Sequence, residues 1–268
     1  MLHQLAINSN TYHGFSLEDC VKGASEAGFT QIELAAVKDH TPHVLPEMSA
    51  KEIHDIKLLL EENNMVCVGV GAHSNVMKKE GIENLLRSVD LAVEFNCPYL
   101  ITATGDAHND TDVIEDENIL MKNLQPILEK CEQHQKVLVL ETHGNNFATG
   151  TSLKKLVQSL SNRVKINYDT ANVMFYGNVF PYEDLEASID AVEFIHLKDK
   201  LGANHEWNFP AIGEGHIDFT RVFTTLQKND YKGPISVEIE FTPAGPSGLE
   251  EVNESVKKSY AYLSRIIG

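Results

Sequence analysis

Short apolar segments rich in β-branched residues alternate with longer amphipathic segments along the whole chain. The apolar segments predict eight strands, at residues 4–8, 31–36, 65–71, 99–104, 136–142, 164–169, 191–198 and 235–240. The segments between them predict helices, with apolar residues at helical spacing in 49–64, 85–95, 119–134, 153–160, 219–227 and 252–267. Ser16 with Asp19, and Ser49 with Glu52, have the spacing of a capping box, so a helix should begin at each pair.

The alternation of strands and helices predicts the fold. Strands that are apolar throughout favour a parallel sheet covered by helices, because such strands are buried on both faces. A chain of 268 residues fits a single (β/α)8 TIM barrel, for which about 250 residues is typical. The alternative is an open doubly wound sheet, but the turn after residues 4–8 lacks the glycine-rich phosphate-binding pattern of that fold. We therefore expect one TIM-barrel domain over residues 1–268.

Composition and charge narrow the classes of partner. The 39 acidic and 22 basic residues give a net charge of −17 with neutral histidines, which disfavours nucleic-acid binding because phosphate backbones require clustered lysine and arginine. No apolar segment reaches the roughly 18 residues that a membrane helix needs, and the N-terminus does not resemble a secretory signal. The four cysteines are widely spaced, which is typical of reduced thiols. We expect a cytoplasmic protein without a membrane span or a cysteine metal site.

Polar side chains gather at the ends of the last four predicted strands. Side chains alternate along a strand, so residues two apart share a face. The pairs that share a face are Glu141 with His143, Asn167 with Asp169, His196 with Lys198, and Glu238 with Glu240. One carboxylate at a strand end is usually solvated or paired with a base, but four such ends on neighbouring strands should meet at the mouth of a barrel. Carboxylates and an imidazole together suit Mn²⁺, Mg²⁺, Co²⁺ or Zn²⁺, so the sequence predicts an open, catalytic metal site.

The segments around these residues are similar to a known family. The matching segments are residues 140–143, 168–172, 195–199, 213–219 and 233–238, and the opening strand and residues 28–33 fit as well. On these segments the chain resembles the xylose isomerase-like TIM-barrel superfamily, in particular its sugar phosphate isomerase/epimerase group. That group takes in ketose 3-epimerases, inosose isomerases and dehydratases, and, more distantly, endonuclease IV.

The resemblance implies both a ligand set and a reaction. It implies one divalent metal ion, with Mn²⁺ expected before Zn²⁺, Co²⁺ or Mg²⁺, held by Glu141, Asp169, His196 and Glu238, with Glu240 as the alternative to Glu238. It also implies that Glu141 and Glu238 act as acid and base in the isomerisation or epimerisation of a small sugar, keto-sugar or cyclitol. A proton next to a carbonyl would be removed and returned through a metal-stabilised enediolate. The family suggests a homodimer or homotetramer.

Two other reactions stay open at this point. His143 shares the face of Glu141, and this Glu-Thr-His arrangement looks like that of metal-dependent lyases that act on 3-oxo-glycosides. A lyase or dehydratase with His143 as base, and a second, unlike subunit, is therefore the first alternative. A DNA-repair enzyme like endonuclease IV is the second, although it would need more histidines and a basic surface.

Further residues are candidates for contact with the substrate. They follow predicted strands or lie in the long loop after the seventh strand, where a sugar would be bound: His73, His108, Asn172, Lys198 and Trp207.

Overall fold

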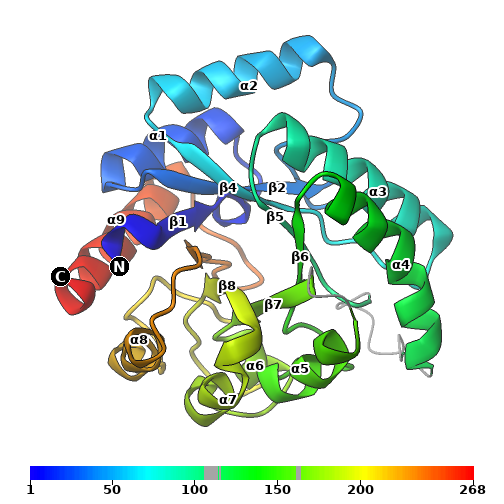
Figure 1. Ribbon diagram of the computed structural model, residues 1–268. Coiled ribbons are helices and arrows are strands. Elements are labelled where there is room, and N and C mark those ends of the chain that lie inside the picture. The colour runs from blue at the N-terminus through cyan, green and yellow to red at the C-terminus, as the bar shows by residue number, and fades with distance from the viewer. Residues whose placement is uncertain (106–113, 115, 161–163) are drawn as a thin grey trace.

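The computed structural model describes residues 1–105, 114, 116–160 and 164–268, and within these ranges the chain forms a closed parallel barrel surrounded by helices (Figure 1). The strands run in the order β1-β9-β8-β7-β6-β5-β4-β2, and pairing of β1 with β2 closes the ring. The barrel strands are β1 (Leu5–Asn8), β2 (Gln31–Val37), β4 (Val66–Gly71), β5 (Tyr99–Thr102), β6 (Val137–Glu141), β7 (Val164–Asp169), β8 (Val192–Leu197) and β9 (Ile235–Val237). The TIM-barrel prediction is confirmed.

Every strand predicted from the sequence is present, with two differences in detail. The short strand β3 (Thr41–Pro42) pairs antiparallel with β2, and two residues are too few to produce a recognisable pattern. Strand β9 ends at Val237, three residues before the predicted end. It stops pairing there because β1 turns into a 3₁₀ helix, Ser9–Tyr12, and the Ile239 N–H donates to the Thr11 hydroxyl instead.

The helices occupy the outside of the barrel (Figure 1). Capping boxes begin α1 and α2 at Ser16 and Ser49, as predicted. Helix α3 begins at Lys79, six residues before the predicted start, and the short helices α6 and α7 were missed because they span too few turns for a periodic pattern. The helices described are α1 (Leu17–Ala27), α2 (Ala50–Glu62), α3 (Lys79–Glu94), α4 (Glu117–Gln133), α5 (Gly150–Ser159), α6 (Asn172–Phe175), α7 (Pro181–Ser188), α8 (Phe219–Lys228) and α9 (Leu249–Ile267).

The barrel interior changes from apolar to polar along its axis. Apolar side chains fill its amino-terminal part: Ala6, Val68, Ile101, Val139 and Phe194. One pleat further along the same strands stand polar residues, among them Asn8, Glu141 and His196, and these are buried too. A second, larger apolar cluster lies between the barrel and the helices. The packed interior therefore supports a group of buried polar side chains at the carboxyl ends of the strands.

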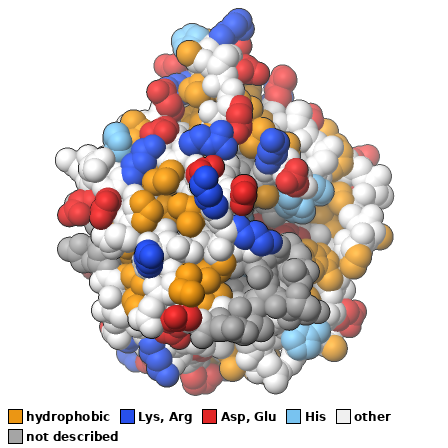
Figure 2. Space-filling view, turned by 90° about the vertical axis from the view of Figure 1, so that its right-hand side faces the viewer, with side chains coloured by type: hydrophobic (Ala, Val, Ile, Leu, Met, Phe, Trp, Pro, Cys, Tyr) orange, Lys and Arg blue, Asp and Glu red, His pale blue; other side chains and the backbone are white. Residues whose placement is uncertain are grey.

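The surface carries charges of both signs. On the face shown in Figure 2, lysine and arginine side chains lie among aspartate and glutamate side chains. Helices α3 and α4 carry such pairs, for example Arg87 with Glu47 and Lys130 with Asp90. Among the described helices, none is long and apolar enough to cross a membrane. All four cysteines are buried and free.

Candidate active site

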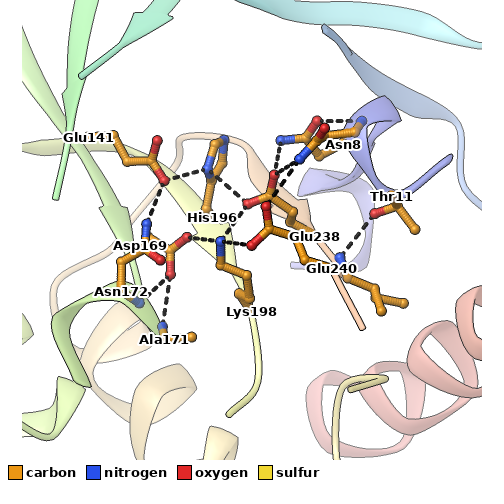
Figure 3. A network of polar contacts seen from close by, with 12 residues as sticks. Asn8, Thr11, Glu141, Asp169, Ala171, Asn172, His196, Lys198, Glu238 and Glu240 are labelled. Carbon is orange, nitrogen blue, oxygen red and sulfur yellow. Dashed lines mark hydrogen bonds and ion pairs between the residues drawn. The ribbon is translucent and has the colours of Figure 1, made fainter. Parts of the chain in front are cut away.

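Four side chains meet where strands β6 to β9 end (Figure 3). Glu141 and Asp169 are the last residues of β6 and β7, His196 is next to last in β8, and Glu238 follows β9. All four are buried, and one ligand atom from each lies within 4.8 Å of those of the other three. The structure thus brings together the group predicted from the sequence, with Glu238 in it.

His196 is held between carboxylates on both sides of its ring. Its Nε2 lies 2.9 Å from the Glu33 Oε2, and its Nδ1 lies 3.1 Å from Glu141 Oε1 and 3.6 Å from Glu238 Oε2. Burial lowers the pKa of His196, but the charges of Glu33 and Glu141 outweigh it and raise the pKa well above its ordinary value. A carboxylate on Nε2 keeps the proton there, which leaves Nδ1 to face Glu141 and Glu238.

Glu141 is held by two further side chains. Its Oε2 is in close contact with His73 Nε2, and its Oε1 accepts a hydrogen bond of 3.1 Å from the Asn172 amide. Burial raises the pKa of Glu141, but the neighbouring His196 and His73 outweigh it and hold the pKa well below its usual range. Glu141 is therefore ionised and held in one orientation.

Lys198 supplies a positive charge on the other side of the group. Its Nζ lies 3.1 Å from Asp169 Oδ2, 3.1 Å from Glu238 Oε2 and 2.9 Å from Glu240 Oε2. Burial raises the pKa of Asp169 to about 7 although Lys198 acts to lower it. The pKa of Glu238 is lowered, because the charge of Lys198 outweighs the opposite effect of burial. Glu240 pairs with Lys198 and with Asn10.

The donor set fits a divalent cation. Three carboxylates and one imidazole nitrogen converge, and oxygen-rich sets with an imidazole bind Mn²⁺, Mg²⁺, Co²⁺ or Zn²⁺. The imidazole is oriented by Glu33, as metal-bound histidines usually are. The high pKa of Asp169 shows that its charge costs free energy among its buried neighbours, and a cation in the group would offset that cost.

A cavity of about 420 Å³ opens above this group. That volume is at the lower end of the range for small-molecule sites in proteins. Asn8 and Asn10, whose amides donate to Glu238 Oε1 at 3.2 and 3.0 Å, line one wall, and Asp39 and His40 of the turn between β2 and β3 stand at the mouth. Most of the described residues that line it have polar or charged side chains, which suits a ligand with many hydroxyl groups.

The structure places the other candidates in different surroundings. His143 lines the cavity with His73, and their ring centroids lie 5.8 Å apart. Trp207 is half-buried and packs edge-to-face against Phe175 and Phe209, apart from the described residues that line the cavity. A contact between Trp207 and a sugar stays a prediction. His108 lies outside the described residues.

Two kinds of residue in the site were missed by the sequence analysis. Glu33 is a charged residue within the apolar segment 31–36, and a charge there is a signal of an interior partner that the analysis passed over. Asn8 ends its strand as Glu141 does, so the argument from strand ends applied to it as well. Asn10 lies in the 3₁₀ helix that follows, and periodicity carries no signal for it.

Comparisons with known proteins agree with this fold. The model of a family described as xylose isomerase-like TIM barrel matches residues 21–264. An inosose dehydratase from Clostridium tetani is 31% identical over 140 residues, which cover 44% of this chain and 45% of that protein. The match thus spans about half the length of this curated relative.

Two solved structures share the fold. A D-tagatose 3-epimerase-like protein superimposes with a TM-score of 0.77 at 21% identity, over 98% of this chain and 97% of the other. A xylose isomerase-like TIM barrel protein from Mycobacterium smegmatis, in complex with magnesium, superimposes with a TM-score of 0.76 at 14% identity, over 99% of this chain and 98% of the other. At these identities the likeness concerns the fold.

Proposed function

The chain belongs to the xylose isomerase-like TIM barrel family, and from this premise we propose that it is a divalent-metal-dependent isomerase or epimerase of a small sugar, keto-sugar or cyclitol. The observation that carries the proposal is the convergence of Glu141, Asp169, His196 and Glu238 beneath a polar cavity. The similarity to an inosose dehydratase and to a D-tagatose 3-epimerase-like protein supports a polyhydroxylated substrate with a carbonyl group. A homodimer or homotetramer is part of the proposal.

The four converging residues would hold the metal, with Mn²⁺ the ion we expect and Zn²⁺, Co²⁺ or Mg²⁺ as alternatives. Once bound, a divalent cation polarises a carbonyl and offsets the negative charge that develops when a neighbouring proton leaves. Glu33 would keep His196 in the tautomer that presents Nδ1. Lys198 would balance the charge of Glu238 and Glu240.

Glu141 and Glu238 would serve as the acid and the base of the epimerisation. They come from β6 and from the end of β9, with His196 between them (Figure 3). One carboxylate would remove the proton from the carbon next to the carbonyl, and the other, after taking up a proton from water, would deliver it to the opposite face. Hydrogen bonds from Asn172 to Glu141 and from Asn8 to Glu238 hold the two groups in place.

The second candidate is a lyase or dehydratase that uses His143 as base. It is favoured by the place of His143 in the cavity wall, beside His73, and by the inosose dehydratase relative. His143 would remove the proton next to the ketone, and the leaving oxygen on the adjacent carbon would take up a proton, from the imidazolium or from water, and depart as water or an aglycone.

Product analysis in heavy water separates the two candidates. The Mn²⁺-loaded protein is incubated with free keto-sugars and inososes, and the products are analysed by mass spectrometry and NMR. Isomerisation or epimerisation gives an isomer that carries solvent deuterium at the reacting carbon. Elimination gives a product that has lost water or an aglycone, and this result would replace the first proposal by the second.

Substitution of His143 by asparagine gives an independent test. Asparagine retains polarity but cannot accept the proton at physiological pH. If Glu141 and Glu238 perform the chemistry, we expect turnover to fall by less than about tenfold, since a general base contributes about 10²- to 10⁴-fold. A fall of that larger size in kcat, with KM little changed, would favour the lyase.

Substitution of Glu33 by glutamine tests how His196 is oriented. The amide can present an N–H to Nε2, which removes the preference for the tautomer with a free Nδ1. We expect Mn²⁺ affinity to fall by about 10- to 100-fold, the usual cost of losing such a partner, as measured by isothermal titration calorimetry. Glu183→Gln is the matched control, because Glu183 is 80% exposed and pairs with Arg221 on the surface. Equal affinities in the two variants would contradict the role of Glu33.

A further inference from the structure

The cavity wall has an excess of negative charge. Among the described residues that line it, Lys198 is the one lysine or arginine. A divalent cation and Lys198 together offset three of the six carboxylates in and beneath the wall, so about three negative charges remain if the histidines are neutral. These carboxylates belong to Glu33, Asp39, Glu141, Asp169, Glu238 and Glu240.

Lys198 is already surrounded by carboxylates of the chain. An ammonium group has three N–H donors, and two of them donate to Glu238 and Glu240 at 3.1 and 2.9 Å. The group also forms an ion pair of 3.1 Å with Asp169, and the side chain is 3% exposed. A phosphate at Lys198 would therefore have to displace carboxylates of the protein itself.

Backbone amides in one of the two loops that commonly form phosphate sites in TIM barrels are bonded to a carboxylate of the chain. Such sites form from backbone amides in the loops after the seventh and eighth strands, which here follow β8 and β9. In the loop after β8, the buried Asp199 accepts hydrogen bonds of 2.8–3.2 Å from the amides of Lys200, Gly213, Gly215 and Ile217. A Cβ on Gly215 would lie 2.2 Å from Asp199 Oδ1, so the glycine permits this close approach.

Two further groups of backbone donors at this end of the barrel are bonded to carboxylates. After β9, helix α9 has Glu250 and Glu251 in its first turn, and Glu251 accepts hydrogen bonds of 2.6 Å from the amide and hydroxyl of Ser247. The first amides of α6 donate to Asp169 Oδ1. Residues 106–113 lie outside the described ranges, and their sequence contains three aspartates and no lysine or arginine.

We propose that the cavity selects an uncharged substrate, a free keto-sugar or cyclitol, and rejects its phosphate esters. This inference rests on the proposed function, because it concerns the same cavity, and it adds the charge class of the substrate. The physical reason is that a phosphate monoester would enter a negatively charged site whose ammonium and backbone amides are bonded to carboxylates of the chain.

Matched pairs of ligands test the inference directly. The protein is loaded with one equivalent of Mn²⁺ and titrated calorimetrically with L-ribulose and L-ribulose 5-phosphate, D-allulose and D-allulose 6-phosphate, and myo-inositol and myo-inositol 1-phosphate. We expect the neutral member of at least one pair to bind about 100-fold more tightly than its phosphate, because bringing like charges together disfavours binding. Equal or tighter binding of the phosphates would overturn the inference and leave the proposed function standing.

The two remaining outcomes are also decisive. If the metal-loaded protein binds none of the six compounds, the substrate class fails, and this inference fails with it. If the protein binds no metal, the proposed function itself fails, whatever the ligand titrations show. Metal content measured before the titrations distinguishes these cases.

Glu240→Gln connects the discrimination to the carboxylates. The variant removes one negative charge from the wall and one ion pair of Lys198, so we expect the preference for the neutral ligand to narrow by about tenfold. Glu183→Gln, with the same chemical change on the outer surface, should leave the preference as it is. An unchanged preference in Glu240→Gln would contradict the proposed cause. Circular dichroism of both variants verifies that they fold.

Discussion

Glu141→Gln and Glu238→Gln should each lose stoichiometric metal and lower turnover by at least about 1000-fold. Glutamine keeps the size of glutamate, but it has no charge to bind a cation and no proton to exchange. Each glutamate is proposed to serve both as a metal ligand and as an acid or base, so its replacement removes two contributions together. The variants should fold, because the amide can still accept hydrogen bonds from Asn172 or Asn8.

The measurement is the metal content of the purified proteins by mass spectrometry, followed by steady-state kinetics with added Mn²⁺. Glu183→Gln is again the control, since it makes the same substitution at an exposed surface pair. Wild-type metal content in both site variants would show that these glutamates are not the ligands. Metal loss with wild-type turnover would show that the reaction does not depend on the metal.

Removal of the metal should cause the largest change in thermal stability. A ligand present at about 1000 times its Kd stabilises the folded state by about 4 kcal/mol. For domains of 150–250 residues each kcal/mol corresponds to roughly 2–4 °C, so chelation should lower Tm by about 8–16 °C. The reason lies in the buried carboxylates, which converge within 4.8 Å and repel one another without a cation.

The test compares melting curves in Mn²⁺ and in EDTA. In Glu141→Gln and Glu238→Gln the difference should nearly vanish, because those proteins have no site to empty. An equal shift in wild type and in both variants would assign the stabilisation to metal bound elsewhere. An unchanged Tm of the wild type in Mn²⁺ and in EDTA would contradict a site that binds the metal tightly.

The sequence alone was enough to predict the barrel and the centre of the site. The eight apolar segments have lengths and spacings that parallel strands require. Parallel strands of a closed barrel present their carboxyl ends at one rim, so polar residues at four strand ends had to converge. Glu141, Asp169 and His196 could therefore be expected to lie together with a glutamate of the last strand, and the family resemblance favoured Glu238 over Glu240 for that place.

Elements too short to show a periodic pattern could not be predicted from the sequence. Strand β3 and helices α6 and α7 were missed because two to eight residues hold too little periodicity. The end of β9 was placed at residue 240 because its apolar and polar alternation continues, although its pairing with β1 stops at Val237. An alternating pattern predicts which side chains share a face of the strand. It does not predict where hydrogen bonding to the neighbouring strand ends.

Only the tertiary structure decided which partner each polar side chain has. The sequence contains Glu33 and His196, yet their hydrogen bond joins residues 163 positions apart, and it exists because the barrel closes between β1 and β2. It likewise contains Lys198 and Glu240, candidates for a substrate contact and for a metal ligand, and only the fold shows that they form an ion pair with each other. Local patterns follow from backbone geometry over a few residues and can be found in the sequence. The choice among several carboxylates for one ammonium or one imidazole depends on distances that only closure of the barrel sets.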